Sequence, residues 1–372
     1  MLQCITKSYK NDISHEEIAA FYSTYVKEDS VSFFLSWGWV DTWLKLVPSE
    51  CELKFIVILQ YDKPICSFFV GKKTIIRGKV FRINQVTLNV SGHKEYDNLW
   101  IEYNGIPSFL NTEICLNQLL DVVSFICDEF CLPGLDMRSF PGRSLQKLTP
   151  PYELIIEDNT ISPYVDLDKI RKNKGDYLSF LSANTRAQIR RSFRELEKYG
   201  SVELEIAADL HHAYQIYEEM KGLHQVVWEK RGESGVFSSG LFDQFHTDLI
   251  TSRFNKGEIQ LLRVCAGDQT VGCLYSFVWK GHVYFYQCGF NYELGKKVKP
   301  GLVSHVLAVK YNADRGHDIY DFLAGNDRYK RDLSTDHNDM VWARIQSETL
   351  KLKVEKGFHT IINKVRKKGA TS

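Results

Sequence analysis

The sequence lacks the cysteine patterns that indicate a disulfide framework or a zinc site. Its 372 residues include nine scattered cysteines, an odd number, and no CxxC pair. Cys127 and Cys131 lie four residues apart on a predicted helix, but no histidine pair accompanies them in the sequence. Zinc sites combine such ligands in close pairs. We therefore expect reduced thiols packed in the core and no metal cofactor.

Long apolar runs and an excess of one charge are also missing. The 47 basic and 46 acidic side chains give a net charge of +1, which does not favour a DNA partner. No apolar run approaches the roughly 20 residues of a membrane-spanning helix. The first residues, MLQCITKSYKNDIS, lack the apolar centre of a signal peptide. We expect a cytoplasmic protein without a transmembrane segment.

The composition is that of a globular chain with the length of two domains. Hydrophobic residues make up 44% of it and aromatic residues 13%, enough to build a substantial core. A polar stretch at 158–176 predicts the boundary, giving domains at 1–165 and 176–346. The remaining residues, 347–372, predict a basic amphipathic helix that packs on the domain or, alternatively, touches a membrane surface.

Two strand-rich segments resemble each other and indicate an internal repeat. They are KFIVILQYDKPICSFFVGKKTIIRG, from Lys54 to Gly78, and EIQLLRVCAGDQTVGCLYSFVWKGHVYFYQCG, from Glu258 to Gly289. Each has an apolar run, an acidic turn and then a strand of small and aromatic residues. The alternative is coincidence, because β-hairpins draw on the same residues everywhere.

Between and after these meanders the spacing of apolar residues predicts helices. Ser182 or Asn184 is expected to cap a helix that stops at Gly200. The fold class that follows is α/β (α+β), with helices around mostly antiparallel strands. The other expected elements are a helix at 117–130 with a break at Pro133-Gly134 and then a strand LDMRS, a strand VELEI, helices at 210–223 and 241–254, a helix after Gly301, and strands IYDFLAG and MVWARI.

Several motifs, in order, resemble the FemAB-like acetyltransferase branch of the GNAT superfamily, which is associated with cellulose or polysaccharide biosynthesis. They are NTRAQIRRSFRELEKYG, LHQVVWEKRG and KPGLVSHVLAVKYNADRGHDIYDFLAGNDRYKRDL, within about residues 178–333. FFLSWGWVDTWL and DNLWIEYNGI are similar to what precedes that domain in the family. The resemblance implies two tandem GNAT-like domains, each a mixed, mostly antiparallel sheet flanked by helices.

The resemblance also implies an activity. It is N-acyl transfer, in the first place of an acetyl group, from acyl-CoA to an amino group of a small molecule or a cell-envelope or polysaccharide precursor. One alternative is a Fem-type transferase that uses aminoacyl-tRNA. Another is a non-catalytic module that keeps the cleft only to bind a ligand.

The donor site that the resemblance implies lies at the strand HVYFYQCGF and the helix after it. GNAT domains have a bulge in this strand, whose exposed backbone N–H groups would hold the thioester carbonyl. The helix start implies cofactor-binding roles for Lys299, Gly301, Leu302 and Val303. Its sequence, GKKVKPGLVS, departs from the family's glycine-rich phosphate loop, so an ordinary basic helix start is the competing interpretation.

Three residues are candidates for catalysis. Asp321 ends a strand in the segment YDFLAGNDRYK that most resembles the family signature, although an acidic residue there equally caps a turn. His224 is a possible base, although a lone helical histidine is more often a packed or surface residue. Tyr286 is a possible proton donor to the leaving thiolate, although core packing is the usual role of a strand tyrosine.

Six residues are candidates for substrate binding. Arg186 and Arg190 share a helix face, which indicates either a solvated surface or a site for a phosphorylated acceptor. Lys330 would bind an anionic group of a substrate. The other three are Trp228, Tyr284 and Tyr329.

Overall fold

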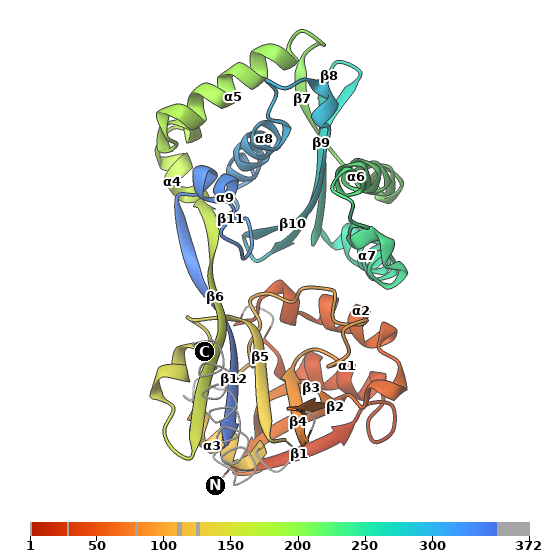
Figure 1. Cartoon of the computed structure of the whole chain (residues 1–372), viewed down its shortest axis with the longest axis vertical. Helices are drawn as coiled ribbons and strands as arrows, with labels where there is room; N and C mark the ends of the chain where they lie inside the picture. The colour runs from red at the N-terminus through yellow and green to blue at the C-terminus, as the bar shows by residue number, and fades with distance from the viewer. Residues whose placement is uncertain (1, 28–29, 79, 110–113, 124–126, 348–372) are drawn as a thin grey trace, which may run out of the picture. The chain divides into compact units, whose positions relative to one another are not determined.

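The computed structural model describes residues 2–27, 30–78, 80–109, 114–123 and 127–347 (Figure 1). Its internal contacts group the chain into two compact units, neither of which is continuous in sequence. Of the described residues, unit 1 holds those within 2–37, 47–159 and 340–347, and unit 2 holds 38–46 and 160–339. The predicted tail helix at 347–372 lies, beyond Ser347, outside the described residues. The division at 165 and 176 into two sequence-continuous domains stays a prediction.

Unit 1 is a mixed sheet in the order β1-β2-β3-β4-β5-β12. Strands β1 to β4 run antiparallel in turn, β5 pairs parallel with β4, and β12 pairs antiparallel with β5. Helix α3 packs its apolar face, including Leu119 and Leu120, into the core with Phe68 and Leu132. The bounds are β1 (Leu2–Ser8), α1 (His15–Tyr25), β2 (Lys54–Gln60), β3 (Lys63–Arg77), β4 (Phe81–Leu88), α3 (Leu116–Val123), β5 (Glu129–Asp136) and β12 (Asp336–Ser347).

Unit 2 repeats this arrangement in the order β7-β8-β9-β10-β11-β6. Three antiparallel pairings join β7 to β10, β11 pairs parallel with β10, and β6 pairs antiparallel with β11. The bounds are β6 (Tyr152–Asp166), α4 (Leu167–Lys172), α5 (Ala183–Leu196), β7 (Val202–Ile206), α6 (Leu210–Lys230), α7 (Gly240–Arg253), β8 (Ile259–Ala266), β9 (Gln269–Trp279), β10 (His282–Phe290), α8 (Pro300–Asp314), β11 (Ile319–Asp321) and α9 (Arg328–Leu333).

Helices cover both faces of the unit 2 sheet. Figure 1 shows α6 and α7 on one face, and α5 and α8 on the other. Alternation along β10 explains this, because Val283 and Phe285 enter one core with Val306 and Val309 of α8, while Tyr286 contacts His246 of α7. Helix α2 (Trp37–Leu46) belongs to unit 2 from Gly38 onward.

The shared topology confirms the predicted fold class. In each unit a three-stranded meander leads through a helix to a strand parallel with the last meander strand. The predicted correspondence between the two meanders is therefore confirmed, and the chain has two tandem units of the same topology. The last partner strand in each unit comes from elsewhere in the chain, β12 for unit 1 and β6 for unit 2.

Local predictions are confirmed at most elements, and the bounds of several are wrong; the predicted strand IYDFLAG, for example, ends at Asp321. Ser182 caps α5 by accepting from the Thr185 N–H at 3.1 Å, as expected. The helix predicted at 117–130 runs too far, because β5 starts at Glu129. β5 continues through the predicted break at Pro133-Gly134 and ends at Asp136, so that the predicted strand LDMRS is a strand only in its first two residues. The polar stretch at 158–176, predicted as the domain boundary, is regular structure up to Lys172, because the end of β6 and helix α4 occupy it; β6 pairs there with β11 at Tyr164, Val165 and Asp166. Helix α6 continues to Lys230 instead of stopping at 223.

Among the described residues, no helix combines the length and apolar character required to cross a bilayer.

Candidate active site

In the unit 2 sheet, β10 extends beyond the end of its parallel neighbour β11, and the sheet opens there. β11 pairs with β10 only from His282 to Tyr284 and ends at Asp321. On the other edge, the register between β10 and β9 shifts between Phe285 and Gln287, so that Tyr286 is an extra residue. Such a bulge bends a strand and ends regular pairing. The predicted bulge is thus present, and β10 continues past it to Phe290 without β11 beside it.

A backbone donor faces this opening. The Asn291 N–H bonds the Val271 carbonyl at 3.0 Å, and bonded and non-bonded positions alternate in an antiparallel ladder. The Cys288 N–H therefore points to the edge away from β9. It donates to the side-chain oxygen Oε1 of Gln287 at 3.0 Å. A side-chain oxygen on a neighbouring residue is an exchangeable partner, so a ligand carbonyl can replace it.

The start of α8 lies close to the end of β10. A Cβ on Gly301 would meet the ring of Phe290 at 3.1 Å, so glycine permits this close approach. The Lys299 N–H is held by Ser192 Oγ of α5 at 3.0 Å, whereas the Lys299 side chain is exposed, as are Lys296 and Lys297. The first N–H groups of a helix and its dipole favour an anion. Val303, by contrast, is buried in the core.

Asp321 occupies the point where the two strands part. Its carboxylate is fully buried and accepts from Ser162 Oγ at 2.7 Å, the Leu323 N–H at 2.7 Å and His282 Nε2 at 3.0 Å. The His282 ring stacks on Tyr284, with centroids 3.9 Å apart. A carboxylate with three donors orients its histidine partner, as in many catalytic dyads.

Residues 183–331 match the protein family described as Acetyltransferase (GNAT) domain. This segment is a GNAT domain. The match spans the helix α5, the meander, the bulged strand β10, α8 and the Asp321 strand, in the order that the motifs predicted.

Solved structures share the fold over nearly the whole chain. A conserved protein of unknown function from Bacteroides thetaiotaomicron VPI-5482 superposes with a TM-score of 0.55 and 11% identity, over 91% of this chain and 99% of that one. FemX gives 0.52 and 10%, over 92% and 98%. The C-terminal domain (DUF2156) of a putative lysylphosphatidylglycerol synthetase from Agrobacterium fabrum gives 0.51 and 8%, over 90% and 93%. At these identities the likeness shows the fold alone.

In the GNAT domain, two predicted site residues gather at the turn after β11. Lys330 is buried, and its Nζ donates to the carbonyls of Leu323 at 3.1 Å and Ala324 at 2.7 Å. The Tyr329 ring stacks on buried His305, with centroids 5.8 Å apart. Burial raises the pKa of Cys288 to about 12 against the opposing charge of Lys330, so the thiol stays neutral. Lys330 therefore stabilises the turn after β11, and an anion could bind its ammonium group only in competition with the Leu323 and Ala324 carbonyls.

His224 and Trp228 lie together on α6 of the GNAT domain, as predicted from their spacing. His224 is buried against Trp228 and Phe237, at 5.6 and 5.0 Å between ring centroids. Burial, with the positive charge of Arg231, lowers the pKa of His224 to about 4. Its Nδ1 has no hydrogen-bond partner within the described part of the chain. His224 is thus neutral at pH 7 and a weak base.

The remaining predicted residues lie on β10 and α5. Tyr286, at the bulge, is half-buried against Phe277 and His246, at 4.7 and 4.8 Å. On α5, Arg186 donates to the Leu181 carbonyl at 2.5 Å, and Arg190 is exposed.

Sequence reasoning missed His282, Ser162 and Ser192. His282 begins the strand motif HVYFYQCGF, so its position next to the bulge was a usable signal. Ser162 and Ser192 are 159 and 107 residues away from their partners Asp321 and Lys299, and no local pattern marks either contact.

Proposed function

We propose that this chain is an N-acyltransferase that moves an acyl group from acyl-CoA directly to an amino group of a small molecule or a saccharide precursor of the cell envelope. The observation that carries the proposal is the parting of β10 from β11 at a bulge, with the Cys288 N–H aimed into the opening. A thioester carbonyl placed there accepts this N–H in place of Gln287, and the bond strengthens as the oxygen becomes negative.

The proposed reaction needs no covalent enzyme intermediate. The acceptor amine attacks the thioester carbon, the C–N bond forms, and the C–S bond breaks to release the CoA thiolate. His282, oriented by Asp321, is our candidate for taking the amine proton by way of bridging water, because Asp321 itself is buried under three donors and Cys288 lies six residues beyond His282 along the strand. Tyr286 at the bulge is the candidate that returns a proton to the thiolate. The exposed Lys299 and the start of α8 are the candidates for the phosphates of CoA.

A second candidate donor is aminoacyl-tRNA. The start of α8 offers three lysines and one glycine instead of a glycine-rich loop, which suits a polyanion as well as a pyrophosphate. The fold likeness to FemX supports the same alternative.

Titration calorimetry of the whole chain with acetyl-CoA, compared with retention of charged tRNA on a filter, separates the two donors. Lys299→Glu keeps the helix start favourable, because a carboxylate suits a helix N-terminus, yet it reverses the charge offered to phosphates. We expect it to weaken acyl-CoA binding at least tenfold, about 1.4 kcal/mol. Lys310→Glu, the same change on an exposed residue at the other end of α8, is the matched control and should change affinity by less than twofold.

Binding of charged tRNA and not of acetyl-CoA would replace the first proposal with the second. Binding of neither donor, with a saccharide still bound, would indicate a non-catalytic module.

A further inference from the structure

The hairpin formed by β3 and β4 in unit 1 presents two aliphatic side chains to solvent. Ile76, near the end of β3, is 70% exposed, and Val80, in the turn before β4, is 74% exposed. They are the most exposed large aliphatic side chains among the described residues. Single apolar residues scattered over a surface need no explanation, but two at the tip of one hairpin form a candidate contact site.

The tip that carries these side chains is held in place. β2 pairs with β3 only as far as Val70, and β5 pairs with β4 only from Gln85 onward, so beyond these points the described strands β3 and β4 pair with each other alone. Arg77, beside the turn, donates from Nη1 and Nη2 to the two carboxylate oxygens of buried Glu129 on β5, each at 2.7 Å. Such a bidentate pair fixes geometry. The exposed tip is therefore presented by an ordered element.

The exposed charge around the tip is positive. From Lys63 to Lys94 the sequence contains seven lysines and arginines and no aspartate or glutamate, in a chain whose net charge is +1. Lys73 and Arg82 are exposed on this hairpin, and Arg82 lies opposite Ile76 in the β3–β4 register. Residues that are directly opposite in an antiparallel pair share one face of the sheet. Basic and aliphatic side chains thus lie next to each other at the tip.

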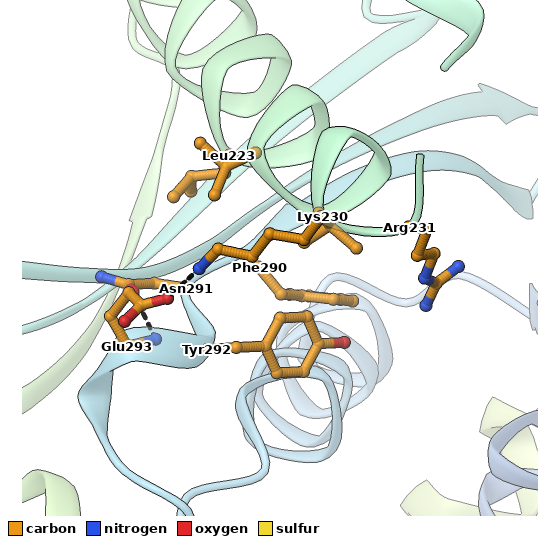
Figure 2. A pocket seen from close by; sticks show the side chains of 9 residues that line it. Leu223, Lys230, Arg231, Phe290, Asn291, Tyr292 and Glu293 are labelled. Atoms are coloured by element: carbon orange, nitrogen blue, oxygen red, sulfur yellow. Dashed lines mark hydrogen bonds and ion pairs between the residues drawn. The ribbon is translucent and has the colours of Figure 1, made fainter. Parts of the chain in front are cut away.

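The pocket of about 410 Å³ between the end of α6 and the residues after β10 differs from the hairpin tip in its charge (Figure 2). Tyr292, which lines it, is 56% exposed, but the charged residues of the pocket are of both signs, namely Lys230, Arg231 and Glu293. Lys230 and Glu293 pair with each other there. Charge therefore selects no occupant for the pocket, whereas at the hairpin tip it selects an anionic partner.

We propose that the β3–β4 hairpin docks this protein on an anionic lipid membrane. Ile76 and Val80 enter the boundary between headgroups and acyl chains. Lys73 and Arg82 contact the lipid phosphates beside them. The proposal does not depend on the identity of the acyl donor.

An anionic membrane suits the tip better than the other partners that its charge allows. A bilayer offers an apolar layer directly beneath an anionic surface, so it accepts both kinds of side chain at once. A nucleic acid is bound through phosphate contacts and through rings that stack on its bases, and neither Ile76 nor Val80 has a ring. A second copy of this chain, joined tip to tip by a twofold axis, would bring like charges together.

Flotation of the full chain with lipid vesicles tests the proposal. Vesicles of phosphatidylglycerol mixed with phosphatidylcholine are compared with vesicles of phosphatidylcholine alone. We expect at least about tenfold stronger binding to the anionic vesicles, because each lysine or arginine near such a surface strengthens binding about fivefold. Added salt should weaken the binding, because it screens exposed charges.

The double variant Ile76→Ser with Val80→Ser tests the apolar part of the contact. It should weaken binding to the anionic vesicles at least about tenfold. Since both side chains are exposed, the fold should survive, and an unchanged thermal transition by circular dichroism checks this. Tyr61→Ser is the matched control, because Tyr61 is 81% exposed in the turn at the opposite end of β3. Arg82→Glu is an independent variant that should weaken binding and reduce its salt dependence.

Equal binding by the wild type and the double variant would overturn the proposal and direct attention to the basic segment 347–372. Equal binding to neutral and anionic vesicles would also overturn it, as would no binding to either. Light scattering distinguishes a second copy from a membrane, since a wild-type dimer that the double variant loses would assign the tip to self-association instead. None of these outcomes concerns acyl-CoA, so a failure here leaves the proposed function standing.

Discussion

At the residue scale, Asp321 and His282 form the most constrained polar pair of the candidate active site. Oδ1 of Asp321 accepts from Ser162 and from the Leu323 N–H, while Oδ2 faces His282 Nε2. Because the carboxylate is fully buried, its position is set by these donors, and it orients the His282 ring. In the proposed function the pair has two roles: Asp321 positions the histidine ring, and His282 takes the proton of the acceptor.

Asp321→Asn tests this division. The amide oxygen can still accept from Ser162 and Leu323, so we expect the fold to survive, but the amide nitrogen now faces His282 and forces the other tautomer. We expect kcat to fall on the order of a hundredfold, with the KM for acyl-CoA nearly unchanged. Steady-state kinetics with saturating acceptor measures both.

Ser162→Ala is the companion variant, because it removes one hydrogen bond and keeps the charge. Ser162→Ala should lower kcat far less than Asp321→Asn does, and the pH profile of kcat should keep the wild-type shape. Wild-type turnover by a folded Asp321→Asn protein would contradict the dyad and direct attention to His224.

At the element scale, the start of α8 is held in place by α5. Ser192 Oγ accepts the Lys299 N–H at 3.0 Å, and this contact fixes where α8 begins relative to the end of β10. The side chain of Lys299 does not cap the helix. The position of the helix N-terminus, which the proposed function assigns to the donor phosphates, thus depends on a hydroxyl 107 residues earlier in the chain.

Ser192→Ala should therefore change donor binding as well as stability. Losing the acceptor of a backbone N–H costs about 1 kcal/mol of unfolding free energy, and we expect acyl-CoA affinity to fall severalfold. Urea unfolding and calorimetry measure the two effects. Ser182→Ala removes the N-cap of the same helix α5 at a similar cost in stability of about 1 kcal/mol. Since Ser182 is remote from Lys299 along α5, the affinity of Ser182→Ala for acyl-CoA should stay at the wild-type value. An equal loss of acyl-CoA affinity in Ser182→Ala and Ser192→Ala would count against a positioning role of Ser192.

At the scale of the whole molecule, the two units are linked through the strands that complete them. β12 pairs with β5 of unit 1, although it comes near the end of the chain, and β6 pairs with β11 of unit 2. Side chains stabilise the pairing of β12 with β5. Buried Glu129 of β5 accepts hydrogen bonds from Arg77 Nη1 at 2.7 Å, from Gln85 Nε2 at 2.7 Å and from Arg344 of β12. Although burial raises the pKa of Glu129, these partners outweigh it and hold the pKa below its usual value.

Neither half of the chain should fold alone. A fragment of residues 1–159 lacks β12, so that β5 is left as an edge strand and Glu129 loses Arg344. We expect this fragment to show no cooperative thermal transition by circular dichroism, whereas co-expression with residues 160–372 should restore a soluble complex. A cooperative melt of the isolated 1–159 fragment, close to that of the intact chain, would refute the dependence.

The sequence by itself determined the fold class, the tandem organisation and the GNAT motifs. Strand alternation, turn residues and the Ser182 cap act over a few positions, so they can be recognised before any folding. The ordered motifs from Asn184 to Leu333 indicated the family for the same reason, and the bulge followed from it. The donor, the acceptor and the catalytic roles of Asp321, His224 and Tyr286 stay predictions.

Only the tertiary structure decided how the site is built. It showed that β10 and β11 part after Tyr284, that Asp321 bonds His282 and Ser162, that Lys330 is already engaged by carbonyls, and that a pocket follows the bulge. The tertiary structure also decided the conformation of β5. The sequence pattern predicted a helix through Phe130, but residues from Glu129 onward pair as a strand between β4 and β12. Each of these features depends on contacts between residues dozens to hundreds of positions apart, which local pattern and propensity do not encode.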